Sequence, residues 1–325
     1  MRNILAIDGG GIRGIIPALV LAEIEARAGR PVAEMFDLIA GTSTGGILAL
    51  GFGLPDSHKQ PMTAQDLSRL YETRGSEIFP SSFWRKFSTL GFITDEKYPH
   101  DGLEKVMREY FQDARYCDAN TRLLVTSYDL LERQPVFFKS WQARWGDVLM
   151  RDIARAASAA PTYFEPLGMT VQGQAMALID GGVFVNNPAM SAYVEAKRLF
   201  PEERRFRILS LGTGEFTNPI KLKDAKEWGK AAWIQPLLDC MFDGVSDSVD
   251  YQLRQLLPKD YIRLQLPLAK GTQSMDDTRQ QNITSLKKQA AKLIQDNDAV
   301  IEQIANWRHK AEKPLLPDAG VSAIV

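Results

Sequence analysis

A serine between two glycines, directly after an apolar run, most constrains how this chain can fold. Gly41-Thr42-Ser43-Thr44-Gly45 follows the run Met35–Ala40. The pattern is typical of a nucleophile elbow, a sharp strand-to-helix turn that pushes the serine side chain outward. Glycines are expected on both sides because a Cβ there would clash with the neighbouring strand and helix. The pattern predicts Ser43 as a covalent nucleophile, and an ordinary helix-capping loop is the alternative.

A second glycine-rich loop lies near the N-terminus. Asp8-Gly9-Gly10-Gly11-Ile12-Arg13-Gly14 follows the apolar run Ile4–Ile7 and precedes a helical pattern over residues 15–28. Consecutive glycines leave backbone N–H groups unshielded, and the positive end of the following helix dipole favours negative charge. We therefore expect an oxyanion hole over residues 9–14, with the amides of Gly10 and Gly11 as its donors and those of Gly9 and Ile12 as further candidates.

The same loop also matches a dinucleotide-binding fingerprint, because Gly9, Gly11 and Gly14 satisfy G-x-G-x-x-G. A dinucleotide site needs an acidic residue at the far end of the second strand, where it holds the ribose hydroxyls. Here that strand ends in Ala40-Gly41-Thr42, and Asp37 lies near its beginning. The arrangement favours the oxyanion hole over a nucleotide site.

A third motif places a carboxylate at the end of an apolar run. Leu178-Ile179-Asp180 is followed by Gly181 and Gly182, and Pro188 suits the first turn of a further helix. A carboxylate in this position is a candidate general base. The alternative is a turn or capping aspartate, which is common before two glycines.

Together the three motifs resemble those of the patatin-like phospholipases, a family of lipid acyl hydrolases. The resemblance lies in DGGGIRG at 8–14, GTSTG at 41–45 and DGG at 180–182, in the family's order. The small-residue stretch 156–164 also fits the segment before the family's aspartate, and the likeness fades beyond Gly214. It implies a three-layer α/β fold, in which helices flank a central, mostly parallel sheet.

The resemblance also implies a Ser-Asp dyad that cleaves fatty-acyl esters, as in a phospholipase A or a lysophospholipase. Ser43 Oγ would attack the ester carbonyl while Asp180 accepts its proton, and Asp180 would then activate water to hydrolyse the acyl-enzyme. Burial is expected to raise the pKa of Asp180 above its reference value of about 3.9 and so make it a better base. Arg13 is expected to fix the glycine loop or to attract an anionic headgroup.

A Ser-His-Asp triad is the alternative mechanism, because Ser43, Asp180 and His309 follow the chain order of α/β-hydrolases. The context of the histidine argues against it. His309 lies in a strongly charged helix end, and His58 and His100 lie in polar, loop-like sequence. A catalytic imidazole is expected in none of these places.

Composition limits the partners. The chain has 325 residues and a formal net charge of −1, so it lacks the basic field of a nucleic-acid-binding protein. No apolar run approaches the ~20 residues of a membrane span, and Met1-Arg2-Asn3 leads directly into the first strand without a signal peptide. We expect a cytoplasmic enzyme without cofactor. Cys117 and Cys240 form no disulfide or metal pattern, and no metal is expected.

Apolar, strand-like runs alternate with helical patterns, which predicts a layered α/β sheet with Ser43 and Asp180 at carboxyl ends of strands. We expect a catalytic domain over residues 3–215, a mostly helical segment packed on the core over 216–312, and a disordered tail over 313–325. The second of these includes one long amphipathic helix over residues 276–307. Some bacterial family members are effectors switched on by a signalling nucleotide, and the segment after Gly214 is a candidate place for such control.

An aromatic segment over residues 79–92 surrounds two cations. Phe83, Trp84 and Phe87 are candidate contacts with a lipid surface or a cover of the active site, and core side chains of an inserted helical region are the alternative. The expected partner is a membrane phospholipid or lysophospholipid. Peripheral membrane contact is expected through these aromatics.

Overall fold

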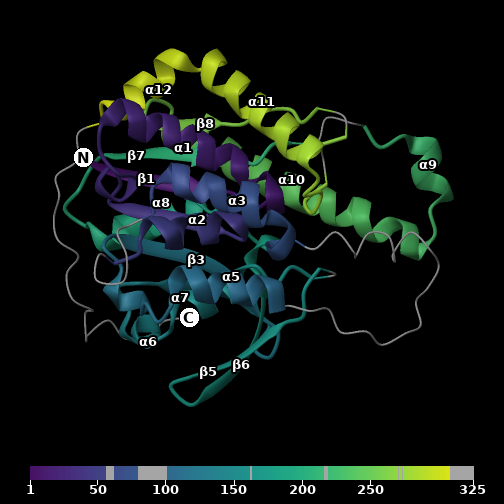
Figure 1. The fold of residues 1–325 in the computed structure, drawn as a ribbon, viewed down its shortest axis with the longest axis horizontal. Helices are drawn as coiled ribbons and strands as arrows, with labels where there is room; N and C mark the ends of the chain where they lie inside the picture. The colour runs from purple at the N-terminus through teal and green to yellow at the C-terminus, as the bar shows by residue number, and fades with distance from the viewer. Residues whose placement is uncertain are drawn as a thin grey trace.

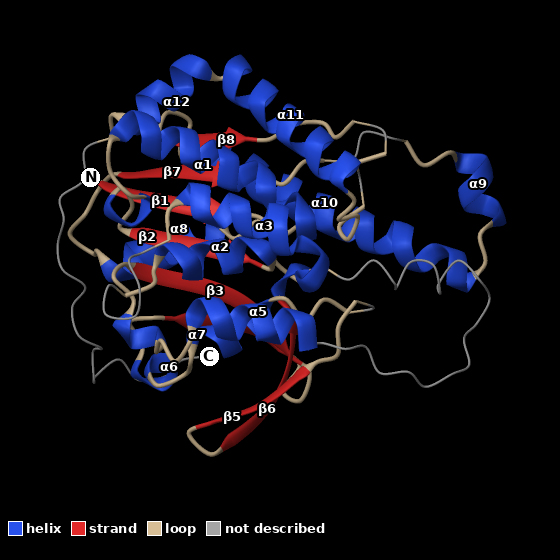
Figure 2. Ribbon diagram, in the orientation of Figure 1, coloured by secondary structure: helices blue, strands red, loops and turns tan. Residues whose placement is uncertain are grey.

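One mixed sheet forms the centre of the protein. The computed structural model describes residues 1–55, 62–79, 101–161, 163–215, 219–269, 271–272 and 274–307. Within these residues eight strands pair in the order β5-β6-β3-β2-β1-β7-β8, with β4 paired to β3 (Figures 1 and 2). The strands are β1 (Arg2–Ile7), β2 (Leu38–Thr42), β3 (Arg122–Asp129), β4 (Gln134–Lys139), β5 (Leu167–Val171), β6 (Gln174–Asp180), β7 (Phe206–Leu211) and β8 (Tyr261–Leu264).

The parallel and antiparallel parts of the sheet are separate. Five neighbouring strands of the sheet are parallel to one another, in the order β3, β2, β1, β7 and β8. Strand β3 is antiparallel to β4 and β6, and β6 is antiparallel to β5. The predicted mostly parallel sheet is therefore confirmed. Its antiparallel strands lie together, from β3 to the β5 end of the sheet.

Helices cover both faces of this sheet. The helices of the described residues are α1 (Ile15–Ala28), α2 (Thr44–Phe52), α3 (Ala64–Ile78), α5 (Asp101–Phe111), α6 (Ala143–Gly146), α7 (Met150–Ala157), α8 (Ala189–Leu199), α9 (Leu222–Glu227), α10 (Lys230–Leu256), α11 (Gln280–Asp296) and α12 (Asp298–Ala305). In the view of Figure 2, β8 lies near the top and the β5–β6 hairpin at the bottom, with α1, α2, α3 and α5 drawn across the strands.

The two faces bury separate hydrophobic cores. Leu5 and Ile7 of β1 belong to the core under α1, whereas Ile4 and Ala6 belong to the core that includes α8 and α10. A strand that is buried on both faces has apolar residues at every position. This explains why residues 4–7 do not alternate between apolar and polar side chains. The three-layer architecture expected from the sequence is confirmed.

The segment after residue 215 is part of the same body. Strand β8 extends the sheet beside β7, and α11 and α12 pack against α1. The prediction of one long helix over 276–307 is wrong, because α11 ends at Asp296 and α12 begins at Asp298. The side chain of Asn297 donates to the carbonyl of Leu293 over 2.8 Å. The backbone of Asn297, with φ −118° and ψ 25°, departs from the helical conformation, and the chain turns there.

Some expectations lie outside the described residues. They concern Phe83, Trp84 and Phe87, the histidines His58, His100 and His309, and the tail 313–325. Phe79, at the start of the aromatic segment, is buried and stacks on Tyr71 with ring centroids 6.2 Å apart. Among the residues that are described, no helix combines the length and apolar character needed to cross a bilayer.

Packing of α11 on α1 gives a stability prediction. Leu286 of α11 is fully buried in the same core as Ile16 and Val20 of α1. Leu286→Ala should lower the free energy of unfolding by about 2–5 kcal/mol, because it removes buried methyl groups and leaves a cavity. Urea denaturation measures this, with the exposed Lys288→Ala on the same helix as the control. A loss no larger than the control's would contradict a structural role for α11.

Candidate active site

Ser43 lies on the predicted elbow between β2 and α2. Its backbone has φ 53° and ψ −123°, a strained conformation for a residue with a side chain. A Cβ on Gly41 would lie 2.1 Å from the carbonyl oxygen of Gly45, and a Cβ on Gly45 would lie 2.2 Å from that of Ile7. Only glycine therefore fits at position 41, two residues before the serine, and at position 45, two residues after it.

Asp180 lies beside Ser43 at the end of β6. Its carboxylate accepts a hydrogen bond over 2.7 Å from the backbone N–H of Gly182, and the Ser43 side chain lies close enough to lower the pKa of Asp180 as a donor. The side chain is buried, and burial raises the pKa of Asp180 to about 6, although the Ser43 side chain opposes the rise. The structure thus brings together a serine hydroxyl and a carboxylate whose pKa is close to neutral.

The registers of β2 and β6 on β3 explain why Ser43 and Asp180 lie side by side. In β2, Thr42 pairs with Thr126 of β3, and in β6, Asp180 pairs with the next residue, Ser127. Strand β6 is antiparallel to β3, so Asp180 does not reach the site as one of several parallel strand ends. It reaches the site because β6 ends at the level where β2 ends, on the other side of β3.

Buried hydroxyl groups connect the elbow with the loop after Asp180. Thr126 Oγ1 donates to Thr42 Oγ1 over 2.8 Å, and Thr42 Oγ1 donates to the carbonyl of Val185 over 2.7 Å. A Cβ on Gly181 would lie 2.2 Å from Thr126 Oγ1. The loop of Gly181 and Gly182 therefore packs directly on these threonines, which fixes it relative to Ser43.

The glycine loop lies next to the serine. A Cβ on Gly9 would be 3.1 Å from the Cβ of Ser43. The N–H of Gly9 donates to the carbonyl of Asn186 over 3.2 Å, and that of Ile12 to the carbonyl of Met275 over 2.8 Å. Within the described part of the chain, the amides of Gly10 and Gly11 have no backbone acceptor. Of the four candidate oxyanion donors, these two are the ones available to a ligand.

Gly14 and Thr44 pack the two motifs together. A Cβ on Gly14 would lie 2.3 Å from Thr44 Oγ1. That hydroxyl in turn shares a hydrogen bond of 2.5 Å with the buried hydroxyl of Tyr71. The first residues of α2 and the end of the glycine loop are therefore in direct contact.

Arg13 and Thr213 hold the glycine loop through hydrogen bonds to its carbonyl groups. Arg13 Nε donates to the carbonyl of Gly10 over 3.2 Å, and Thr213 Oγ1 donates to that of Gly9 over 2.6 Å. Arg13 is almost fully buried, and burial lowers the pKa of its guanidinium to about 10, against the effect of Asp243. The guanidinium is still charged near neutral pH, and its contact with Gly10 agrees with the expected role of fixing the loop.

A buried ion pair anchors the start of the loop. Arg263 of β8 donates to both carboxylate oxygens of Asp8, over 2.9 and 2.5 Å, and also to Ser210 Oγ over 2.8 Å. Burial would lower the pKa of Arg263, but the adjacent Asp8 carboxylate outweighs it and raises the pKa. The pair fixes Asp8 at the point where β1 gives way to the glycines.

Sequence reasoning missed the part that the C-terminal segment plays here. Arg263, Met275 and Thr213 all contact residues 8–12, and none belongs to a recognised motif. Arg263 left a signal, because it interrupts the otherwise apolar residues of β8. A lone charge inside a buried strand needs a partner, and Asp8 supplies it.

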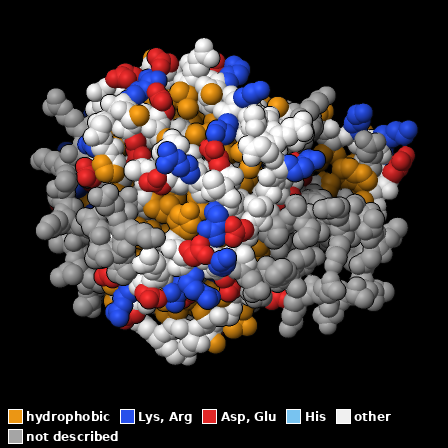
Figure 3. All heavy atoms as spheres, viewed as in Figure 1, with side chains coloured by type: hydrophobic (Ala, Val, Ile, Leu, Met, Phe, Trp, Pro, Cys, Tyr) orange, Lys and Arg blue, Asp and Glu red, His pale blue; other side chains and the backbone are white. Residues whose placement is uncertain are grey.

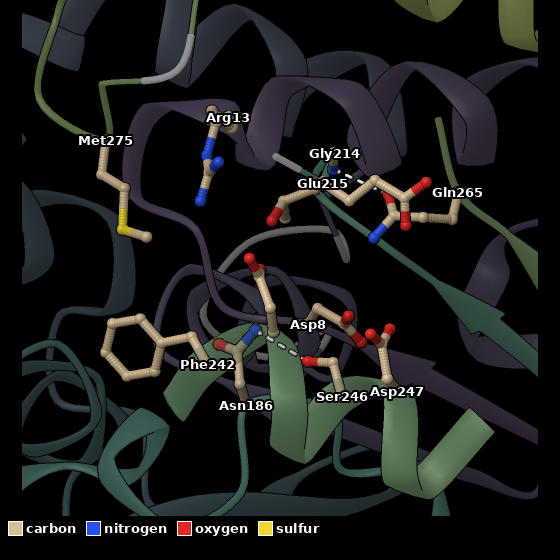
Figure 4. A pocket seen from close by; sticks show the side chains of 12 residues that line it. Asp8, Arg13, Asn186, Gly214, Glu215, Phe242, Ser246, Asp247, Gln265 and Met275 are labelled. Atoms are coloured by element: carbon tan, nitrogen blue, oxygen red, sulfur yellow. Dashed lines mark hydrogen bonds between the residues drawn. The ribbon is translucent and has the colours of Figure 1, made fainter. Parts of the chain in front are cut away.

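A small polar cavity adjoins the glycine loop (Figure 4). Its volume is about 90 Å³, and neither Ser43 nor Asp180 lines it. Carboxylates from α10 and from the loop after β7 face Arg13 across it, and burial raises the pKa of Asp243 to about 6. The cavity is too small and too polar for an acyl chain. Its lining includes Asp8, Arg13, Asn186, Glu215, Phe242, Asp243, Ser246 and Asp247.

Gly11 offers a test of the loop, with Gly29 as a matched control. Both have positive φ, 59° and 65°. A Cβ on Gly11 would lie 2.2 Å from the carbonyl of Met275, whereas a Cβ on Gly29 would meet nothing within 4 Å. Gly11→Ala should lower ester turnover by about 10²- to 10³-fold, because it displaces the oxyanion donors. Gly29→Ala should affect only stability.

Ester hydrolysis by the purified variants measures this, with thermal unfolding as the check on stability. Normal turnover in folded Gly11→Ala would contradict an oxyanion role for the loop.

Comparisons with known proteins agree with the motifs. The family model described as patatin-like phospholipase matches residues 5–193. Patatin-like protein 2 of Oryza sativa subsp. indica is 31% identical, over 91% of this chain and 84% of that protein. The cGAMP-activated phospholipase of Pseudomonas aeruginosa is 34% identical, over 81% of this chain and 77% of that protein. The structure of human GIVD cytosolic phospholipase A2 gives a TM-score of 0.47 at 13% identity, over 94% of this chain and 60% of that one.

Proposed function

We propose that this chain, which belongs to the patatin-like phospholipase family, cleaves fatty-acyl ester bonds of phospholipids or lysophospholipids through Ser43 and Asp180. Membership of the family supports lipid hydrolysis. The observation that supports this pair of residues is that the side chain of Ser43, on its strained turn, lies beside the buried carboxylate of Asp180 and lowers its pKa as a donor.

Acylation begins with the hydroxyl of Ser43. As its oxygen attacks the ester carbonyl, its proton passes to the adjacent Asp180 carboxylate. The carbonyl π bond opens and leaves negative charge on the former carbonyl oxygen. The amides of Gly10 and Gly11, at the positive end of the 3-10 helix Gly11–Gly14 and of α1, stabilise this charge.

Collapse of the tetrahedral intermediate releases the alcohol, which takes the proton from Asp180. The acyl group stays on Ser43, and Asp180 is again a carboxylate. It then accepts a proton from a water molecule that attacks the acyl-enzyme, and the fatty acid leaves as Ser43 regains its proton. Asp180 thus acts as base and acid in both halves of the reaction.

The environment of Asp180 makes this use of an aspartate reasonable. An ordinary aspartate is a poor base near neutral pH, because its pKa is about 3.9. Burial raises the pKa of Asp180 to about 6, so that it is a stronger base and is still ionised at neutral pH. The Gly182 amide keeps the carboxylate oriented through its hydrogen bond.

The raised pKa predicts an acid limb in the pH profile. The reactive form has Asp180 ionised, so kcat/KM should fall as pH drops through about 6, because the buried carboxyl becomes protonated. Below that midpoint the loss should be about tenfold for each pH unit. A soluble short-chain ester measures this without a lipid interface. A midpoint near 4 would contradict the effect of burial, and one near 7 that disappears in His309→Ala would assign the base to histidine.

Substitution of the pair tests the dyad directly. Ser43→Ala and Asp180→Asn should each lower ester turnover by about 10⁴-fold or more, since the nucleophile or the proton acceptor is lost. Ser191→Ala and Asp113→Asn, away from the site, are the controls. Circular dichroism checks folding, and a fluorophosphonate should label Ser43.

The histidine variants separate the dyad from the triad. His58→Ala, His100→Ala and His309→Ala should each keep most of the turnover. Near-complete loss in folded His309→Ala would overturn the dyad in favour of the triad.

Nucleotide control is a second candidate feature of this function. It is supported by the similarity to the cGAMP-activated phospholipase, which extends over 81% of this chain. Ester hydrolysis with and without cGAMP tests it. Equal rates over a range of cGAMP concentrations would rule out activation by this nucleotide, and would leave the dyad unaffected.

A further inference from the structure

Exposed hydrophobic side chains are concentrated on one segment. Eleven large hydrophobic side chains are exposed among the described residues, and five of these lie between residues 220 and 241. They are Ile220, Leu222, Trp233, Leu237 and Met241. Single exposed apolar residues are normal on a protein surface, but a local concentration marks an interaction site.

These side chains belong to a part of the molecule that projects from the body. In Figure 1, α9 and the beginning of α10 extend to the right, beyond the sheet and its flanking helices. Trp233, Leu237 and Met241 follow one another at four-residue spacing on α10, so they form one stripe along the helix. The ring of Trp228 contacts that of Trp233 edge-on, with centroids 5.2 Å apart.

Positive charge accompanies the stripe. Lys221, Lys223 and Lys226 are exposed in and next to α9, and residues 221–230 contain four lysines against two acidic residues. Figure 3 shows hydrophobic and basic side chains together at this end of the molecule. Tryptophan, aliphatic side chains and lysine in one helical segment are typical of elements that lie in the interface of a bilayer with anionic lipids.

The projecting segment is continuous with the candidate active site. About 14 Å along α10 from Trp233, Phe242 lines the polar cavity beside the glycine loop. A Cβ on Gly182 would lie 3.3 Å from the Phe242 ring, so the helix also contacts the loop after Asp180. The stripe therefore lies on the same helix as a residue that contacts the loop after Asp180.

We propose that α9 and the first half of α10 dock on the surface of a phospholipid bilayer, with Trp233, Leu237 and Met241 inserted among the lipids and the lysines facing anionic headgroups. The proposal rests on the proposed function, since it takes the phospholipid substrate to come from that bilayer. The surface differs from the aromatic segment of Phe83, Trp84 and Phe87 that the sequence suggested.

Matched triple variants test the stripe. The stripe variant carries Trp233→Ser, Leu237→Ser and Met241→Ser, at side chains that are 39%, 50% and 42% exposed. The control carries Leu130→Ser, Leu131→Ser and Val194→Ser, at side chains that are 42%, 60% and 49% exposed elsewhere. The probe is flotation with vesicles of phosphatidylcholine and phosphatidylglycerol. The stripe variant should bind them at least about tenfold more weakly than wild type, and the control should bind normally.

Hydrolysis of a soluble ester separates this proposal from the proposed function. Both triple variants should keep wild-type turnover of a short-chain ester, because neither touches the catalytic residues. Failure of the wild type to hydrolyse that ester would contradict the proposed chemistry. The vesicle-binding comparison would still test the docking surface, because it does not depend on catalysis. Equal vesicle binding by the stripe variant and the control would overturn the docking surface.

Two further measurements identify the occupant. Lys221→Gln, Lys223→Gln and Lys226→Gln together should weaken binding by about fivefold for each lysine on vesicles with phosphatidylglycerol, and much less on pure phosphatidylcholine. Sedimentation of wild type and stripe variant tests a second copy of the chain as the occupant. A dimer that the stripe substitutions dissociate, with vesicle binding unchanged, would overturn the proposal in favour of self-association.

Discussion

The burial of Asp180 is the constraint on which the rest of the site depends. A carboxylate with an ordinary pKa is too weak a base for serine activation, and a fully protonated one accepts no proton. Burial places the pKa of Asp180 at about 6, and the donors of Ser43 and Gly182 keep the rise from going further. Strand β3 determines where the buried carboxylate lies, because it carries β2 on one side and β6 on the other. Geometry and basicity therefore have one structural origin.

The glycine loop depends on parts of the chain that are far away in sequence. Three successive glycines have no stable conformation of their own, since glycine loses the most backbone freedom on folding. Here the loop is fixed by Asp8 bound to Arg263, by the Gly9 carbonyl bound to Thr213, and by Ile12 bound to Met275. The C-terminal segment thus completes the candidate active site, and it also carries the helix that we propose to dock on lipid.

The sequence predicted the strands that precede the three motifs, because apolar runs are local signals. Apolar runs buried on two faces identify β1 and β2, and a serine between glycines identifies a sharp turn. The sequence did not predict features that depend on contacts with distant segments of the chain. The direction of β6 depends on its pairing with β3, and the break at Asn297 separates two helices that both pack on α1. Neither has a periodic pattern that a sequence displays.

The sequence by itself determined the family and the residues available for chemistry, because glycines with no room for a Cβ and a serine on a tight turn are local requirements. Only the tertiary structure decided which of those groups meet. It engaged the amides of Gly9 and Ile12 with other carbonyls, and it placed Asp180 beside Ser43 through an antiparallel strand. Hydrogen-bond partners and burial come from segments that are distant in the chain, and a pKa depends on both.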